Sequence, residues 1–403
     1  MAPYGKSMKK STGKKHVLLV IESSRAYGRG IIQGVTRYVE HHGRWTVGFE
    51  EQGVLTNIPT WLKDWKGDGI ICRTGNSPLG RHLRTLCGPI VELLGDGVRY
   101  ISEVQSDAEK TAELAAEHLC NLGLRHFAYY SYGNVWWGGL RGERFAGALR
   151  RRGFTCDILI SRSGRQQLSF PLWQSTFEGA LLRWLKQLPK PIGIWTAADT
   201  VAKRVHESCS KLAISVPDQV ALLGVDNDAH LCNVLTPSLS SIDPNPVMVG
   251  YRAAQLLDQK MHREKLPPLP IRIPPLGIVT RQSTDMIAAD DPEMIRLARF
   301  IRENALTGLR VADVVRQSDL SKRTLERRFK KCFGRTIDHE IVQLKMEHAK
   351  KLLLETVLSV GEIGSRSGFD ANYFIKAFRR VVGLSPSEFR KKFQVAGRDP
   401  SLR

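Results

Sequence analysis

The chain has 403 residues, more than one ordinary domain contains, and 42% of them are hydrophobic, enough for two or three packed cores. It carries 60 Lys and Arg against 40 Asp and Glu, and this formal net charge of +20 favours an anionic partner, nucleic acid before a membrane surface. The alternative is a basic protein without such a partner. No apolar run approaches the ~18 residues of a membrane span and no secretory signal is present, so we expect a cytoplasmic protein.

Two local features of the composition narrow the class further. The first 15 residues contain five lysines among Gly, Ser, Thr and Pro, which is typical of a disordered leader. The seven cysteines are scattered, with no Cys-x-x-Cys pair and no Cys/His zinc spacing. We therefore expect reduced cysteines, no metal site and no bound cofactor.

From residue 16 to about 283, short apolar runs alternate with amphipathic segments, which is the pattern of mostly parallel sheets with helices on both faces. The predicted strands are His16–Glu22, Trp45–Glu51, Gly69–Arg73, Pro89–Leu94, Tyr100–Val104, His126–Tyr132, Cys156–Ser161, Pro191–Ala197 and Val220–Val225. The predicted helices are Gly28–His42, Ser77–Cys87, Asp107–Leu122, Gly138–Arg152, Trp173–Leu188, Thr200–Leu212 and Val247–Glu264. The run is long enough for two sheets, so the predicted fold class is a two-lobed α/β domain with a cleft between its lobes.

The segment after the first predicted strand, Gly28-Arg-Gly-Ile-Ile-Gln-Gly34, has a weak likeness to a dinucleotide-binding loop. Its spacing is GxGxxxG, and only the Glu50-Glu51 pair is a weak candidate for the acidic residue expected about 20 residues on. No P-loop, GxSxG or HExxH motif occurs. The sequence therefore predicts that the protein is not an enzyme.

Residues 281–292 (RQSTDMIAADDP) are polar and indicate a linker, after which the pattern is entirely helical. In this helical part, Val311–Gly334 and Val360–Gly383 are two copies of one pattern, 49 residues apart. The coinciding positions include Val314 and Ile363, Leu325 and Phe374, Phe329 and Phe378, Lys330-Lys331 and Arg379-Arg380, and Gly334 and Gly383. A helix-turn-helix that occurs twice predicts two second helices that enter DNA major grooves.

The stretch Gly368–Lys391 resembles the signature of the AraC/XylS family of transcription regulators, and the likeness extends over residues 293–393. Gly368 suits a tight turn, Asp370 suits an N-cap, and Ser385-Pro-Ser-Glu388 is a capping box with proline at the first helical position. The resemblance implies a first recognition helix from Ser321 to about Lys331. The implied DNA-binding residues are Lys322, Arg323, Glu326, Arg327, Lys331, Asn372, Tyr373, Lys376, Arg379 and Arg380. Solvated faces of a helical bundle are the alternative for these side chains.

The implied contacts differ in kind along the two helices. Arg323, Glu326 and Arg327 hold the positions that meet base edges in family members, and Arg pairs with guanine as Glu does with cytosine. Lys322, Lys330 and Lys331 suit phosphates, as do Arg379 and Arg380. The helix predicted at 336–355 is roughly 30 Å long at 1.5 Å per residue, close to one DNA turn of about 34 Å. One subunit is therefore expected to reach two successive major grooves.

Residues 16–283 resemble the effector domain of LacI/GalR-type regulators, which has the periplasmic-binding-protein fold. The likeness lies in Leu222-Leu-Gly-Val-Asp-Asn-Asp228, Leu235–Ile242, Gly250–Leu257, Ile194–Asp199 and Gly142–Gly147. Ligands of open α/β sheets bind at the carboxyl ends of strands. The candidate ligand-binding residues at such ends are Arg25, Tyr27, Trp136, Trp137, Arg144, Asp199 and Asp226. Carboxylates, Arg and aromatic faces suit a sugar, although each of the charged residues could instead form a structural ion pair.

The joining of these two domain types is uncommon, and it resembles the arrangement in bacterial regulators of xylose utilisation genes. The likeness implies a D-xylose-dependent activator that binds double-stranded promoter DNA at direct-repeat half-sites, contacts RNA polymerase and forms a homodimer. The same architecture with another pentose or sugar is an open alternative. A transport-type sugar-binding protein is opposed by the helix-turn-helix repeat and the missing signal. Enzymes such as DNA alkyl-transferases with an AraC-type segment need a cysteine cluster that is absent here.

The predicted organisation follows from these segments. The parts are a basic leader 1–15, an effector domain 16–283, a linker 284–292, a DNA-binding domain 293–393 with helix-turn-helix units 311–334 and 360–383, and a tail 394–403. The effector domain is expected to close around the sugar and thereby to re-orient the two helix-turn-helix units.

Overall fold

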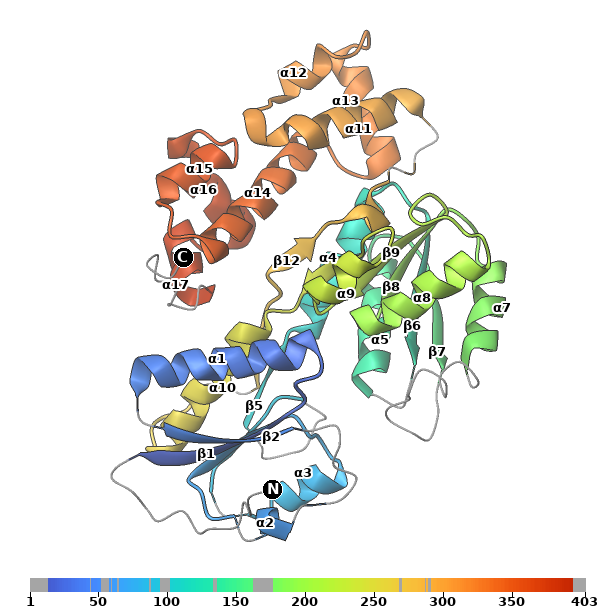
Figure 1. Cartoon of the computed structure of the whole chain (residues 1–403). Helices are drawn as coiled ribbons and strands as arrows, with labels where there is room; N and C mark the ends of the chain where they lie inside the picture. The colour runs from blue at the N-terminus through green and yellow to red at the C-terminus, as the bar shows by residue number, and fades with distance from the viewer. Residues whose placement is uncertain are drawn as a thin grey trace. The chain divides into compact units, whose positions relative to one another are not determined.

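The computed structural model describes residues 14–393 except 44, 52–57, 59, 64, 87, 95–101, 133–135, 162–176, 268–269, 287 and 289–290. The predicted tail, and the predicted leader up to residue 13, lie outside the described residues. Two compact units are present (Figure 1): one holds the described residues up to Asp107 together with Pro244–Pro274, the other Ala108–Asp243 together with the described residues from 275 to 393. Within the described part of the chain, no helix is long and apolar enough to cross a membrane.

The first unit contains a parallel sheet with the strand order β11-β5-β4-β3-β1-β2. Its strands are β1 (Lys15–Ile21), β2 (Trp45–Glu51), β3 (Gly69–Cys72), β4 (Ile90–Glu92), β5 (Ser102–Ser106) and β11 (Ile271–Ile273). Its helices are α1 (Ala26–His42), α2 (Thr60–Lys63), α3 (Pro78–Leu83) and α10 (Pro246–Met261). Side chains alternate along β1: Val17 and Leu19 join the core under α1 and α10, while Leu18 joins the core under α2 and α3.

Helices α1 and α10 lie side by side on one face of this sheet (Figure 1), and glycines allow their close approach. A Cβ on Gly34 would stand 2.0 Å from the carbonyl oxygen of Val247, and one on Gly250 would stand 2.0 Å from that of Ile31. A Cβ on Gly30 would likewise stand 2.5 Å from the ring of Pro246. Helix packing therefore explains Gly30 and Gly34, and the close carbonyl of Glu22, which a Cβ on Gly28 would meet at 1.6 Å, explains Gly28. No dinucleotide is needed to account for the spacing.

The second unit contains the other sheet, in the order β12-β10-β9-β8-β6-β7, with β12 antiparallel at its edge. Its strands are β6 (His126–Tyr132), β7 (Asp157–Ser161), β8 (Ile192–Thr196), β9 (Val220–Val225), β10 (Ser240–Asp243) and β12 (Gly277–Val279). Its helices are α4 (Ala108–Asn121), α5 (Trp136–Arg150), α7 (Gly179–Gln187), α8 (Asp199–Lys211) and α9 (Ala229–Val234). Helix α5 packs beside α4, and α7 packs beside α8. Right-handed crossovers place these two pairs on opposite faces of the sheet.

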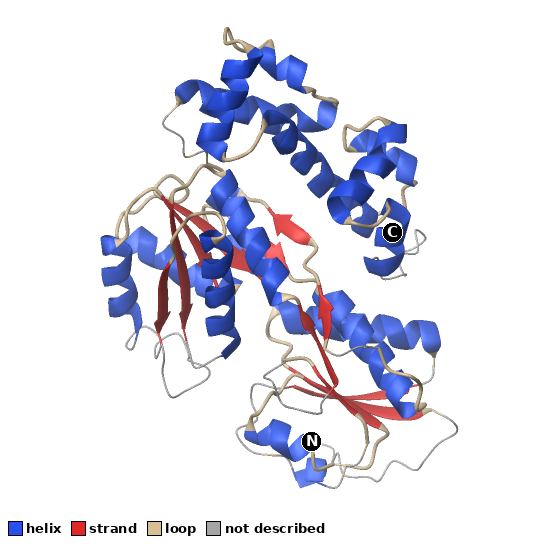
Figure 2. Cartoon of the chain, turned by 180° about the vertical axis from the view of Figure 1, so that it is seen from behind, coloured by secondary structure: helices blue, strands red, loops and turns tan. Residues whose placement is uncertain are grey.

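From Pro292 to Phe393, all regular secondary structure of the described chain is helical, as Figure 2 shows. Its helices are α11 (Pro292–Asn304), α12 (Val311–Val315), α13 (Lys322–Phe333), α14 (Ile337–Glu355), α15 (Val360–Arg366), α16 (Ala371–Val382) and α17 (Pro386–Phe393). They enclose two cores, one around α11–α13 and one around α15–α17. Helix α14 serves both, because Ile337 and Ile341 lie in the first core and Met346 and Leu353 in the second.

The 49-residue repeat is confirmed as a repeat of structure. Leu325 and Phe374 are both fully buried, as are the equivalent Phe329 and Phe378. Gly334 ends α13 and Gly383 follows α16, with φ of 73° and 78°, and their amides donate to Lys330 O at 2.8 Å and to Arg379 O at 2.9 Å. Such left-handed positions favour glycine, so the coinciding glycines have a steric cause. The predicted capping box is also present, since Glu388 N donates to Ser385 Oγ at 3.2 Å and Ser385 N to Glu388 Oε2 at 2.7 Å.

The predicted fold class, two α/β lobes followed by an all-helical double helix-turn-helix region, is confirmed. Every predicted strand is present, with ends displaced by at most two residues. The sequence did not predict β10, β11 and β12, because these strands are short and lie in Ser- or Pro-rich segments. The start of the polar segment 281–292 also differs from a linker: Ser283 is fully buried and its Oγ donates to Leu222 O at 2.6 Å.

The packing of α1 on α10 yields a stability prediction. Gly250→Ala should lower the free energy of unfolding by about 1–3 kcal/mol, because the new Cβ would clash with the backbone of α1. The matched control is Gly147→Ala in α5, where a Cβ would meet only Arg151 Nη1 at 3.7 Å and where about 0.5–1 kcal/mol should be gained. Urea unfolding followed by circular dichroism measures both. Equal stability of the two variants would contradict close helix contact.

Candidate DNA interface and effector-binding residues

Recognition helix α13 has one buried face and one basic exposed face. Ser321 caps its start, where Oγ accepts from Thr324 N at 3.3 Å. Because Leu325 and Phe329 fill the core, the opposite side of α13 faces outward, and Lys322, Arg323 and Arg327 are exposed. The helical period thus places these predicted DNA contacts on one accessible surface.

The other two predicted contacts of α13 have additional partners. Glu326 is half-buried and its Oε2 accepts from Ile337 N at 3.4 Å, at the start of α14. Lys331 has an exposed side chain, while its carbonyl accepts from Arg125 Nη2 at 3.2 Å. Glu326 therefore also helps to begin α14, because a carboxylate is favourable near a helix N-terminus.

Helix α16 presents the second predicted surface. Phe374 and Phe378 are buried, and the outward residues Tyr373, Lys376, Arg379 and Arg380 are exposed. Arg380 Nη2 donates to Tyr373 Oη at 3.4 Å, so the phenol and the guanidinium form one polar group. The side chain of Asn372 lies outside the described part of the chain. The two recognition helices differ in chemistry, since α16 has Asn372 and Lys376 where α13 has Arg323 and Arg327, and Tyr373 where α13 has Thr324.

In the first unit, polar residues gather at the carboxyl ends of the strands. Tyr27 Oη shares a hydrogen bond of 2.9 Å with Ser106 Oγ at the end of β5, and the guanidinium of Arg73 lies over its ring at 5.2 Å. Arg25 Nε lies 3.3 Å from Glu22 Oε1 just after β1. The sequence reasoning missed Arg73 and Ser106. The available signal was position, because Arg73 directly follows β3 and Ser106 ends β5.

A buried carboxylate holds the loops at this edge in place. Glu92 ends β4, is 1% exposed, and accepts from the backbone amides of Thr74, Gly75, Leu93 and Leu94 at 3.0–3.2 Å. Burial raises the pKa of Glu92, while the amides act in the opposite direction by stabilising the carboxylate. Arg73 directly precedes Thr74, whose amide Glu92 accepts, so Glu92 helps to hold the backbone next to Arg73.

In the second unit, Asp199 has the corresponding supporting place. It starts α8 after β8, is 1% exposed, and accepts from Ser241 Oγ at 2.6 Å and from Asp228 N at 2.8 Å. Burial first, and the charge of Asp226 second, raise the pKa of Asp199. The predicted role of Asp199 as a ligand contact stays a prediction. In the structure, its carboxylate bonds to groups of the protein itself, Ser241 Oγ and Asp228 N.

Asp226 lies in the loop after β9, to which Asp199 is bonded through the Asp228 amide. It follows β9, is half-buried, and has a positive φ of 116°, which is rare for a residue with a side chain. Its neighbour Asn227 has a φ of 48°, and Asn227 Oδ1 accepts from Arg281 Nη2 at 3.0 Å. Such backbone is maintained only where the surroundings fix it, and it is frequent at ligand sites.

Helix α5 contributes an aromatic and basic group near the same edge. Arg141 lies over the Trp137 ring at 5.1 Å, and its Nη1 donates to the carbonyl of Ala197, between β8 and Asp199. Arg144, one turn later, is 3.2 Å from Glu109 Oε2 and has a side chain 53% exposed. The side chain of Trp136 lies outside the described residues. Sequence reasoning missed Arg141, whose signal was its i+4 spacing from Trp137.

The described residues contain no group of three or more His, Cys, Asp or Glu that could hold a metal ion. What the fold does present is a pair of α/β lobes with polar groups at strand ends, followed by two helix-turn-helix units with exposed basic helices. These features define a regulator that binds DNA through its C-terminal region.

Comparison with known proteins supports this class. A family model described as a periplasmic binding protein-like domain matches residues 116–284, and one described as a helix-turn-helix domain matches residues 314–392. The xylose operon regulatory protein of Escherichia coli K12 is 28% identical over 94% of this chain and 97% of its own length. That of Haemophilus influenzae is 27% identical over 93% and 97%. A solved structure of a xylose-binding transcription activator covers 95% of this chain and 99% of its own at 27% identity, with a TM-score of 0.59.

The chain thus joins a periplasmic-binding-protein-like domain to an AraC-type helix-turn-helix region. It is a DNA-binding transcription regulator and not an enzyme, as the sequence predicted.

The place of Asp199 yields a prediction for the second unit. Asp199→Ala should lower the free energy of unfolding by about 1–3 kcal/mol, because Ser241 Oγ and Asp228 N lose their buried acceptor. The control Asp218→Ala removes an exposed carboxylate of the same unit and should change stability by less than about 0.5 kcal/mol. Thermal unfolding measures both. If the two variants melt alike, Asp199 does not organise this loop.

Proposed function

We propose that this regulator responds to a sugar, D-xylose first among the candidates, and activates genes for its use. The observation that carries the proposal is the likeness to xylose operon regulatory proteins, which spans both domains and nearly the full length of each chain. Another pentose or sugar is the second candidate, because identity of 28% leaves room for a changed pocket.

The polar groups at the strand ends suit a sugar. Asp226 offers a carboxylate that accepts from paired hydroxyls, and Arg25, Arg73 and Arg141 offer forked donors. Tyr27 and Trp137 offer aromatic faces for the C–H surface of a sugar ring. The predicted ligand contacts Trp136 and Arg144 belong to the same proposal. We assign Asp199 to positioning the loop of Asp226. Sugar binding shifts the protein toward the conformation that binds sugar more tightly.

The DNA-binding region is proposed to read direct-repeat half-sites in two successive major grooves. Helix α14 has 19 residues, about 28 Å of helix, which is close to the repeat of the major groove. In this proposal Arg323, Glu326 and Arg327 read bases, whereas Lys322, Lys331, Arg379 and Arg380 contact phosphates. The second helix reads through Asn372, Tyr373 and Lys376. A homodimer that recruits RNA polymerase in the cytoplasm completes the proposal.

Calorimetry on the full chain tests the effector. D-xylose should release or absorb heat with a saturable curve, and L-arabinose, D-ribose and D-glucose should bind more weakly. Asp226→Ala should abolish the heat because the hydroxyl acceptor is lost, while DNA binding without sugar persists. Absence of heat with every pentose would refute the sugar identity, and heat with ribose alone would favour the second candidate.

DNA selection from a random library tests the base readers. Arg327→Ala should cost about 1–3 kcal/mol on the selected sequence and relax preference at one position, because an Arg–guanine pair is lost. Lys322→Ala, on the same exposed face, should weaken selected and unrelated DNA alike. An Arg327 variant that keeps the full wild-type preference would remove this residue from the readout.

A further inference from the structure

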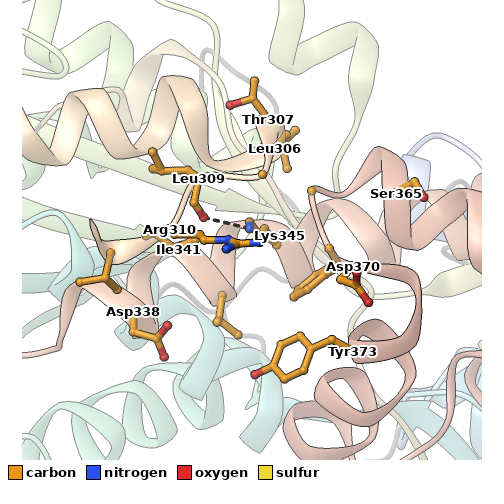
Figure 3. A pocket seen from close by; sticks show the side chains of 15 residues that line it. Leu306, Thr307, Leu309, Arg310, Asp338, Ile341, Lys345, Ser365, Asp370 and Tyr373 are labelled. Atoms are coloured by element: carbon orange, nitrogen blue, oxygen red, sulfur yellow. Dashed lines mark hydrogen bonds between the residues drawn. The ribbon is translucent and has the colours of Figure 1, made fainter. Parts of the chain in front are cut away.

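A pocket of about 750 Å³ lies between the two helix-turn-helix units (Figure 3). It is lined by residues 306–311 before and into α12, by the first half of α14, by Ser365 of α15, and by residues of the turn into α16 and of its first turn. Its volume is far more than a bound water needs. The pocket is therefore bounded by residues on the side of the first helix-turn-helix unit and by residues of the second.

Two cations face this pocket. Lys345 is only 6% exposed, and its Nζ donates to Leu309 O at 3.1 Å and lies 5.5 Å from the ring centre of Phe369. An ammonium has three donors, and among the described residues the Leu309 carbonyl is its one hydrogen-bond acceptor. Arg310 is exposed and stands beside it in Figure 3. Burial first, and the charge of Arg310 next, lower the pKa of Lys345, so an anion between them would stabilise both.

Burial and the charge of Arg310 still lower the pKa of Lys345, although the charges of Asp338 on the rim and of Asp313 act in the opposite direction. Asp338 lies in the first turn of α14 and Asp370 directly before α16, where helix amides favour a carboxylate. Asp338 and Arg310 each line the pocket, yet no ion pair between them is formed in the described chain. The donors of Lys345 and Arg310 thus remain available for a ligand of the opposite charge.

The rim of the pocket also carries a predicted DNA contact. Tyr373 lines it and is 47% exposed on the outward face of α16. A protein that reads two successive major grooves must pass over the phosphodiester strand between them, and that strand is a polyanion. The pocket lies between the two helix-turn-helix units, and its Arg310, Lys345 and Tyr373 suit contact with such a strand.

We propose that the pocket between the helix-turn-helix units binds the DNA backbone between the two half-sites, with Arg310 and Lys345 as phosphate contacts and Tyr373 at its rim. The proposal rests on the proposed reading of two successive grooves. These residues position the protein on DNA and add affinity for any sequence, because phosphates carry no base identity. The same chemistry could take a free phosphate, and the test separates the two sources.

The test measures binding of the full-length protein to its selected DNA over a series of salt concentrations. Arg310→Gln and Lys345→Met should each weaken binding to selected and unrelated DNA alike and reduce the salt slope by about 0.9. The matched control is Lys351→Gln, an exposed residue of α14 outside the pocket, which should leave the slope unchanged. Circular dichroism checks folding, and the exposed Arg310 keeps the test decisive if the buried Lys345 variant unfolds.

Neutral methylphosphonate linkages between the half-sites give the second arm. They should weaken the wild type but have little further effect on Arg310→Gln, since both changes remove one contact. Wild-type affinity and slope in Arg310→Gln would overturn the inference and leave the proposed function intact. Absence of any selected DNA for the wild type would instead refute the proposed function. A melting temperature raised by inorganic phosphate, with no methylphosphonate effect, would assign the pocket to free phosphate and overturn the backbone assignment.

Discussion

The DNA-binding region depends on one helix that belongs to two cores at once. The first turns of α14 supply Ile337 and Ile341 to the core under α13, and later turns supply Met346 and Leu353 to the core under α16. A continuous hydrogen-bonded helix resists stretching and bending, so it holds the two recognition helices at a set separation. DNA presents its major grooves at a set repeat, and for that reason the length of α14 matters as much as the side chains of α13 and α16.

A loop supports this helix from the side. Lys345 donates to Leu309 O, and a Cβ on Gly368 would stand 2.8–2.9 Å from the carbonyl oxygens of Leu306 and Ala305. The loop that leads into the first helix-turn-helix therefore packs against both α14 and the turn of the second. The two units are coupled through this loop as well as through α14, and a bound anion at Lys345 would act on both.

In each α/β lobe, a buried carboxylate bonds to the loops that follow the carboxyl ends of the strands. Glu92 accepts four backbone amides in the first unit, and Asp199 accepts one amide and the hydroxyl of Ser241 in the second. Sequence could indicate Asp199 as an acid at a strand end, since that follows from the run before it. Sequence could not separate it from Asp226, because which acid points inward depends on the strands that surround it. Arg73 and Arg141 were missed although a local signal was present, because Arg73 directly follows β3 and Arg141 lies four residues after Trp137.

The sequence by itself determined the order of the domains, the parallel sheets, and the buried and exposed faces of the recognition helices. The faces of the recognition helices follow from periodicity, since Leu325, Phe329 and their equivalents 49 residues later mark the buried side of each helix. Tertiary structure alone decided that the glycines of α1 serve its contact with α10, that Asp199 is enclosed, and that Arg310 and Lys345 share a pocket. The physical reason is that these facts depend on segments far apart in the chain, whose approach no local pattern records.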